Sequence, residues 1–166
     1  MQQHITRKMF FVTLGVALLF QSGCAKDDGR PKDFPKVHPV SITITQEGQP
    51  LEGASVVLES ATKSKYSSSG TTDVSGVATI KTYSYLGAPV GDYTVLVKKS
   101  VPENQVEMKT PEGDTYLAGG DYYNYVAPKY SEKESAFKIT VTDKGGKETF
   151  EVGAPVRVFL YKVSTN

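Results

Sequence analysis

The sequence predicts an all-β protein, an antiparallel β-sandwich of about seven to eight strands. Three observations lead to this prediction. Apolar and polar residues alternate along short segments, turn-forming clusters separate these segments at regular intervals, and no amphipathic run is long enough for a helix of several turns. Ten tyrosines supply most of the aromatic side chains, which also suits a β-rich domain.

Residues 40–97 contain the clearest strand patterns. Turn clusters at residues 46–50 and 72–76 separate segments in which every second residue is apolar. Residues 63–69 are polar and contain lysines, which predicts a short edge strand protected from pairing with other chains. The side chains expected to face the core are those of Val40, Ile42, Ile44, Val56, Leu58, Ala78, Ile80, Tyr93, Val95 and Val97.

Five residues of this region are assigned structural roles. Gly53 allows a tight turn before a strand, and Gly76 supplies a positive φ in a hairpin turn. The carboxylate of Asp73 is expected to accept hydrogen bonds from the backbone amides that follow it. Gly91 opens a strand in which Tyr93 buries its ring and directs its hydroxyl to a nearby backbone group.

Residues 100–135 are expected to form a long, tyrosine-rich insertion. No regular period persists there, because prolines and a pair of glycines interrupt the segment. After the insertion, strands are expected at residues 137–141, 150–152 and 156–160. The sandwich is therefore predicted to span residues 40–163.

The tyrosine-rich insertion also supplies the candidate ligand-binding residues. Aromatic faces beside acids and an amide suit glycan or peptide surfaces, because rings cover C–H groups while polar side chains bond hydroxyls. The alternative is that the rings only pin the loop onto the sandwich. If residues 123–125 are extended, their two rings lie on one side. The candidates are Tyr116, Asp121, Tyr122, Tyr123, Asn124 and Tyr125.

Residues 1–23 have the features of a secretory signal peptide. Arg7 and Lys8 precede an apolar run at residues 9–20, which is shorter than a membrane span. The run ends in Ser22-Gly23-Cys24, which resembles a bacterial lipobox, with Gln21 departing from the pattern. The resemblance implies cleavage before Cys24, acylation of Cys24 with chains such as palmitate, and a location on the extracytoplasmic side of the cell envelope, periplasmic or cell-surface.

Two alternatives to lipidation remain open. The signal peptide is cut elsewhere and leaves a free thiol, or it stays uncleaved as an N-terminal anchor. In either lipidated or unlipidated form, the lone cysteine excludes an intramolecular disulfide. Residues 24–39 hold three prolines and seven charges, which predicts an extended tether that reaches up to roughly 45 Å, with His38 solvated at its end.

The charge balance excludes one class of partner. The whole chain has 19 basic and 18 acidic side chains, and loss of Arg7 and Lys8 leaves a net charge of −1. Such a near-neutral, interspersed surface gives no electrostatic basis for binding nucleic acid.

Four short motifs resemble the carboxypeptidase regulatory-like domains, a transthyretin-like (prealbumin-like) sandwich family. They are Gly48–Ala54 (GQPLEGA), Thr72–Ile80 (TDVSGVATI), Pro89–Val95 (PVGDYTV) and the later Pro128–Ser131 (PKYS). The last motif is similar to small lipoproteins of planctomycete-like bacteria. The resemblance implies a sandwich architecture and no particular activity, because a fold does not fix function.

The residue inventory disfavours an enzyme. Nucleophilic catalysis needs an activated Ser or Cys beside a base, and the chain without its signal offers only His38 and an acylated Cys24. No metal site or cofactor is expected. The transthyretin-related hydrolases end in Tyr-Arg-Gly-Ser, whereas this chain has Tyr161-Lys162-Val163-Ser164. The expected function is a non-enzymatic, lipid-anchored envelope protein with a structural or interaction domain, and the alternative is a glycan- or peptide-binding module.

Overall fold

The computed structural model describes residues 30–62 and 65–164. The chain divides into a unit that ends at Phe34 and a unit formed by residues 35–166. Of the first unit, the described part is a turn in which the Phe34 N–H donates to the Pro31 carbonyl at 2.9 Å. The expected signal peptide and Cys24 lie outside the described residues. All strands described below belong to the second unit.

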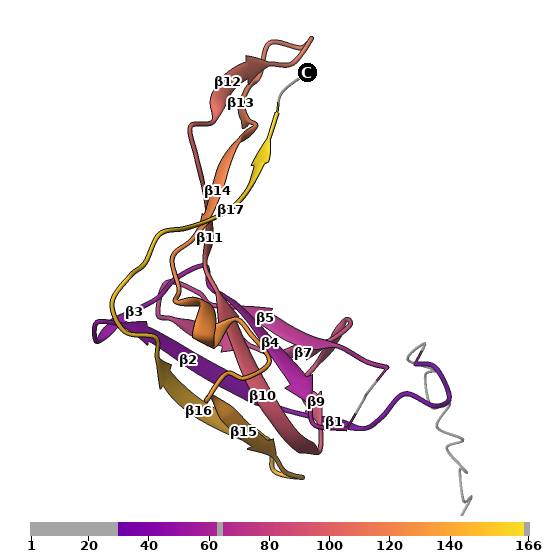
Figure 1. Cartoon of the computed structure of the whole chain (residues 1–166). Helices are drawn as coiled ribbons and strands as arrows, with labels where there is room; N and C mark the ends of the chain where they lie inside the picture. The colour runs from indigo at the N-terminus through magenta and orange to yellow at the C-terminus, as the bar shows by residue number, and fades with distance from the viewer. Residues whose placement is uncertain (1–29, 63–64, 165–166) are drawn as a thin grey trace, which may run out of the picture. The chain divides into compact units, whose positions relative to one another are not determined.

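The second unit is all-β and consistent with the predicted sandwich (Figure 1). One sheet has the order β15 (Lys138–Val141), β10 (Gly91–Lys98), β4 (Ser55–Ser60), β5 (Ser68–Thr71), β7 (Lys81–Thr82) and β8 (Tyr85–Leu86). The other contains β16 (Gly146–Glu151), β2 (Val40–Gln46), β3 (Gln49–Pro50) and β6 (Val77–Thr79). A separate pair joins β1 (Val37–His38) to β9 (Ala88–Pro89). These pairings are antiparallel except that β16 runs parallel to β2.

The core of the sandwich lies between the two sheets. All ten side chains that the alternation placed inside are buried, which confirms the predicted phase of these strands. Ile139 and Val141 of β15 and Val152, which follows β16, also belong to the core. The alternation of apolar and polar residues predicts which side chains face the core, because each of these strands buries one face and exposes the other.

The turn between β5 and β6 has the predicted chemistry. Asp73 Oδ1 accepts hydrogen bonds from the Ser75 N–H at 2.9 Å, the Ser75 hydroxyl at 2.6 Å and the Val77 N–H at 3.0 Å. The Ser75 hydroxyl bond is the main cause that lowers the pKa of Asp73. Gly76 has φ 74°, and a Cβ there would lie 2.6 Å from the Ile44 carbonyl oxygen. The turn therefore requires glycine for both conformation and space.

Gly53, Gly91 and Tyr93 also occupy their expected places. Gly53 has φ 68° in the turn before β4, and Gly91 is the first residue of β10. The Tyr93 ring is buried, and its hydroxyl donates to the Pro89 carbonyl at 2.8 Å. Burial raises the pKa of this phenol.

A row of aromatic rings closes one side of the sandwich. Tyr130 belongs to the 3-10 helix η1 (Pro128–Tyr130) and stacks on Phe137 with ring centroids 4.5 Å apart. Phe137 in turn stacks on Phe150 of β16 at 4.6 Å. For Tyr130, the ring therefore pins its segment onto the sandwich.

The end of the predicted tether is part of the fold. Val37 and His38 form β1, and the His38 side chain is 7 % exposed rather than solvated. His38 Nδ1 donates to the Asp143 carbonyl at 2.7 Å. The prediction was wrong because a polar side chain next to prolines is typical of a linker. In the structure the backbone of His38 pairs with β9, and its ring is hydrogen-bonded to a carbonyl.

The predicted edge strand at residues 63–69 is also wrong. Residues 63 and 64 lie outside the described part, and β5 begins only at Ser68. This strand pairs with both β4 and β7, so it lies inside the sheet. The polar side chains predicted an exposed edge, but the Ser68 hydroxyl is buried. It forms a hydrogen bond of 2.8 Å with the Thr82 hydroxyl, so both hydroxyls are satisfied inside the protein.

Candidate interaction site

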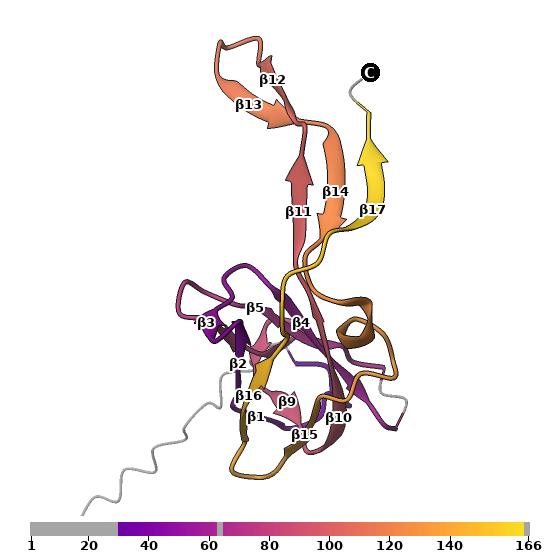
Figure 2. The same ribbon diagram turned by 60° about the vertical axis from the view of Figure 1, so that its left-hand side comes forward.

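Residues 100–124 form strands rather than the long loop that was expected. Two pairs of strands run through the segment: β11 (Ser100–Glu103) pairs with β14 (Gly120–Asn124), and β12 (Val106–Lys109) pairs with β13 (Thr115–Ala118). The last strand, β17 (Val158–Val163), pairs with β14 instead of joining the sandwich. We call residues 99–125 and 157–164 the arm. Figures 1 and 2 show the arm continuing beyond the end of β10.

The arm was missed because it lacks the alternation that identifies a half-buried strand. Its strands have four to six residues, and Pro111, Gly113 and Gly119 interrupt the segment that contains them. Both faces of the sheet β11–β14–β17 carry partly exposed side chains, so neither face produces an apolar phase. The last strand was expected at residues 156–160, and the structure places it at Val158–Val163.

Asn124 fixes the base of the arm. Its side-chain oxygen accepts hydrogen bonds from the Lys99 N–H at 3.0 Å and the Val126 N–H at 3.2 Å. Its side-chain nitrogen donates to the Val126 carbonyl at 2.7 Å. Because the residue is 2 % exposed and its amide is satisfied, it does not fit the predicted role of a ligand contact.

A bulge in β17 distributes aromatic pairs over both faces of the arm. Tyr122 stacks on Tyr161 with centroids 4.8 Å apart, whereas Tyr123 meets Phe159 edge-on at 5.6 Å. The register shifts between Tyr122 and Tyr123, so Leu160 has no partner in β14. Since consecutive residues of β14 point to opposite faces, the two aromatic pairs lie on opposite faces.

A charged cluster lies on the Tyr123 face. Arg157 donates to both carboxylate oxygens of Glu103, from Nε at 3.2 Å and from Nη2 at 2.7 Å. Its guanidinium carbon lies 3.6 Å from the centroid of the Tyr123 ring. The Tyr125 hydroxyl also donates to Glu103. Tyr123 and Tyr125 therefore contact one cluster, as expected for an extended segment 123–125.

The cluster shifts the pKa values of its members. Hydrogen bonds from Arg157, and then from Tyr125, lower the pKa of Glu103. The hydrogen bond between Tyr125 and Glu103 is the largest cause that raises the pKa of Tyr125. The hydrogen bonds between Arg157 and Glu103 are the largest cause that raises the pKa of Arg157. All three groups keep their ordinary charge at neutral pH, so the cluster is a structural clasp rather than an acid–base pair.

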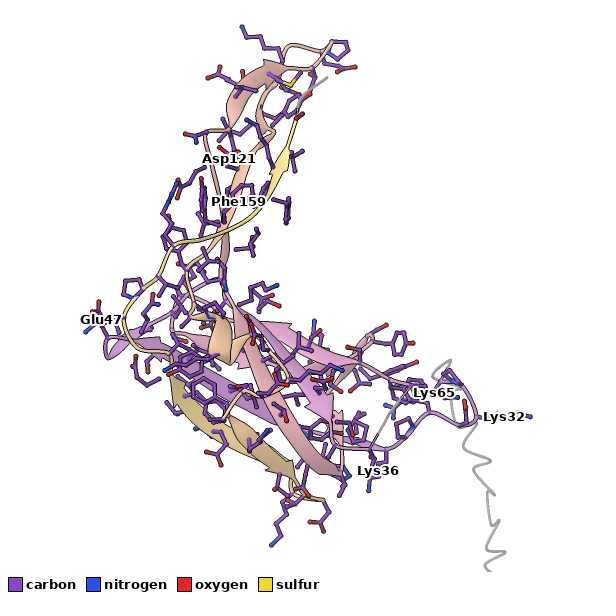
Figure 3. The ribbon with its side chains drawn as sticks, viewed as in Figure 1. Lys32, Lys36, Glu47, Lys65, Asp121 and Phe159 are labelled. Atoms are coloured by element: carbon purple, nitrogen blue, oxygen red, sulfur yellow. The ribbon has the colours of Figure 1, made fainter. Side chains whose placement is uncertain are left out.

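Asp121 is also engaged within the arm. Its Oδ2 accepts a hydrogen bond from Asn104 Nδ2 at 3.1 Å, and its Oδ1 lies 3.8 Å from Lys162 Nζ. Figure 3 shows Asp121 and Phe159 on neighbouring strands of the arm. The predicted ligand-binding acid therefore has two protein partners.

Exposed apolar side chains gather on the arm. Tyr116 of β13 is 46 % exposed, and its neighbour Leu117 is 62 % exposed. Isolated surface apolar residues are ordinary, whereas a group of them on one part of a molecule makes that part a candidate interaction surface. The exposed apolar set of the arm consists of Val106, Tyr116, Leu117, Phe159, Tyr161 and Val163.

A second concave feature lies on the sandwich. An open groove of about 810 Å³ crosses the outer face of β4 and β10, where Val57 and Leu96 are among its lining residues. The loop at residues 131–134 borders it, and Lys133 lies 3.2 Å from Glu59 in an ion pair. None of the predicted ligand-binding residues lines this groove.

Four residues that contact the predicted tyrosines of the arm were not predicted: Glu103, Arg157, Phe159 and Tyr161. A signal for three of them exists, since Arg157, Phe159 and Tyr161 alternate in one phase of the last strand. The strand expected at residues 156–160 was identified by its aliphatic residues Val156, Val158 and Leu160, and the side chains between them were given no role.

Comparisons with protein-family models, with curated proteins and with solved structures found no match. The resemblance to carboxypeptidase regulatory-like domains therefore stays a prediction. Within residues 30–62 and 65–164, no group of three or more His, Cys, Asp or Glu side chains is arranged to hold a metal ion. No helix in that part of the chain is long and apolar enough to cross a membrane.

Proposed function

We propose that this chain is a non-enzymatic, lipid-anchored protein of the bacterial cell envelope whose arm binds a macromolecular partner. The sandwich is the scaffold, and the arm is the binding element. One observation carries the proposal: the arm is a two-sided sheet whose exposed side chains include six large apolar residues. Such a surface is costly in water and is typical of protein interaction sites.

The arrangement of the rings favours a protein partner over a glycan. Sugar binding by stacking uses the open face of an aromatic ring, whereas Tyr122 is stacked on Tyr161 and Arg157 covers Tyr123. The side chains that stay exposed include Leu117, Val106 and Phe159. Aliphatic and aromatic groups of this kind match a protein surface.

The proposed anchor is supported by the sequence. Cys24 follows a short apolar run and small residues, in the order of a lipobox, and two or more acyl chains give stable membrane attachment. The segment between Cys24 and β1 is rich in proline and charge, which suits a tether. A tethered domain of this kind presents its surface to other envelope components.

The second candidate function is binding of an envelope glycan or an unfolded peptide through the tyrosine-rich segment. Tyr116 favours it, because this ring lies in the β12–β13 hairpin and is nearly half exposed. No described contact pairs the Tyr116 ring with another ring. Its ring is therefore the best placed of the predicted candidates for stacking on a ligand.

One set of variants tests both functions. Tyr116→Ala and Leu117→Ser remove exposed side chains, so the melting temperature should stay within about 2 °C of the parent while partner binding falls. Binding is measured with the full chain on a glycan array and against solubilised envelope proteins, with Thr94→Ala on the sandwich as the control. Unchanged binding by both variants contradicts the proposed role of the arm. Loss of glycan binding by Tyr116→Ala alone favours the second function.

A further inference from the structure

We propose that the arm is a self-association surface: two copies of this chain pair side by side with their arms antiparallel, so that the acidic tip of each arm lies against the basic base of the other. The inference rests on the proposed function of the arm as a binding element and names a second copy as the partner.

The charge of the arm is separated along its length. The tip, formed by the β12–β13 hairpin, carries Glu107, Glu112 and Asp114 against the single base Lys109. All four side chains are exposed. Within the described residues, none of the three tip carboxylates forms a salt bridge. The tip therefore has an uncompensated negative charge.

The base of the arm has the opposite sign, because Lys98, Lys99 and Lys129 outnumber the exposed Glu52. Lys98 ends β10 and is exposed, and the next residue, Lys99, donates from its side chain to the Glu52 carbonyl. Lys129 lies in η1, which is near β10, and its Nζ is 4.8 Å from the centroid of the Tyr130 ring. The acids that follow η1 line the groove beside Leu96, farther along β10 from the arm.

The middle of the arm is electrically neutral. Glu103 is paired with Arg157, and Asp121 is paired with Lys162. Phe159 is exposed on the Tyr123 face and Tyr161 on the opposite face, so each face of this stretch carries one exposed ring. A second arm can therefore cover the middle by apolar contact without meeting an unpaired charge.

The separation of charge selects the orientation of the second copy. Ten extended residues from the start of β11 to the end of β12 span about 33 Å, several times the screening length of about 8 Å at physiological ionic strength. The two ends therefore act independently. Parallel arms bring two acidic tips together, whereas antiparallel arms bring each tip to a basic base, and a two-fold axis makes both contacts identical.

The apolar area fits a weak, reversible pair. A buried aromatic side chain covers about 150–250 Å², and the exposed rings are divided between two faces, so one face with its aliphatic groups offers on the order of 250 Å² per copy. The total of roughly 500 Å² is below the roughly 1,000 Å² of a stable specific interface, so the charged contacts at the two ends must add to the stability of the pair. Lipid anchoring on one membrane raises the effective concentration of the second copy, which suits an interface of this size.

Charge reversal in two separate variants gives a direct test. The tip-reversed chain carries Glu107→Lys and Glu112→Lys, and the base-reversed chain carries Lys98→Glu and Lys129→Glu. Each variant opposes like charges when it pairs with itself. When the two variants pair with each other, both contacts of the two-fold pair are again opposite in sign.

The readout is co-capture of full chains that carry two different epitope tags, from detergent-solubilised membranes. We expect the parent to capture itself, each variant to capture itself at least fivefold less, and the mixed pair to recover most of the parental level. Recovery in the mixed pair also shows that both variants are folded. Raising the salt from about 50 to 500 mM should weaken the parental pair.

Two results overturn the inference. In the first, the parent does not capture itself, or each variant captures itself as well as the parent does. In the other, the arm cross-links only to a different protein. The second result leaves the proposed function standing, because that function requires a partner but not a second copy.

Discussion

Glu103 and Arg157 lie 54 positions apart in the chain, yet they form a two-point ion pair that crosses the central strand of the arm. Glu103 belongs to β11 and Arg157 precedes β17, and these two strands are the edges of the sheet whose middle strand is β14. Tyr123 of β14 lies beneath the guanidinium. The pair therefore clasps all three strands of the arm.

Glu103→Gln should loosen the arm and leave the sandwich intact. The neutral amide loses the ion pair with Arg157 and weakens the bond from Tyr125. Hydrogen exchange should become faster in β11, β14 and β17 while β2 and β10 keep their protection. Glu107→Gln is the matched control, because Glu107 is exposed and has no salt bridge among the described residues. Equal exchange in the two variants contradicts the clasp.

The ordering of the arm should depend on pH. The pKa of Glu103 is lowered from its ordinary value of 4.5, mainly by the hydrogen bond from Arg157. A carboxyl group whose pKa is lower in the folded arm than in the unfolded chain stabilises the folded arm fully when the pH is above the unfolded-state pKa. This stabilisation is lost as the pH falls through the folded-state pKa. Exchange in the arm should therefore accelerate below about pH 4.5. The acceleration should be much smaller in Glu103→Gln, and an identical pH profile would falsify this assignment.

Gly76→Val should destabilise the sandwich by about 1–3 kcal/mol. The substitution places a β-branched residue at φ 74° and brings its Cβ against the Ile44 carbonyl. The free energy of unfolding is measured by denaturant titration, with Val74→Ala as the control in the same turn, since Val74 is 78 % exposed. A midpoint equal to that of the control removes Gly76 from its proposed role.

The stacked pair Tyr122–Tyr161 should contribute a coupling energy of about 0.5–1.5 kcal/mol to the stability of the arm. A double-mutant cycle of Tyr122→Ala and Tyr161→Ala measures it through the exchange of arm amides. Tyr122→Ala with Val163→Ala is the reference cycle, because Val163 pairs with Gly120 in the register. If the effects of Tyr122→Ala and Tyr161→Ala on exchange are additive, the stacked pair contributes no coupling energy.

Cys24→Ala should release the chain from the membrane. The prediction follows from the position of Cys24 after the apolar run and from the weakness of a single short apolar segment as an anchor. Cells labelled with a fatty-acid analogue are fractionated with detergent, and Ser22→Ala, which keeps a small residue in the lipobox, is the control. A variant that stays in the detergent phase without label contradicts lipidation.

The sequence predicted the sandwich well and the arm poorly, for a physical reason. Val40 and Tyr93 lie on strands that bury one face, and this burial imposes an alternation that can be read directly. Tyr122 and Phe159 lie on strands without a buried face, where only long-range pairing makes a sheet. The pairs Tyr122–Tyr161 and Tyr123–Phe159 join residues 39 and 36 positions apart, and pairing at this separation leaves no local pattern in the sequence.

His38 shows the same limit in a single residue. Prolines on either side of residues 36–38 favour an extended chain, and an extended, proline-rich segment predicts a tether. An extended segment is also what a strand requires, and the available edge was β9, about 50 residues away. Only the fold decides between a linker and a short strand in such a case.

Photo-cross-linking in living cells tests the central claim, that the arm is the binding element, most directly. A photoreactive phenylalanine analogue is placed at Leu117 of the arm or at Val74 of the sandwich, two exposed apolar positions. Discrete cross-linked products are expected from position 117 and little product from position 74. Equal labelling from the two positions, or labelling from position 74 alone, contradicts it.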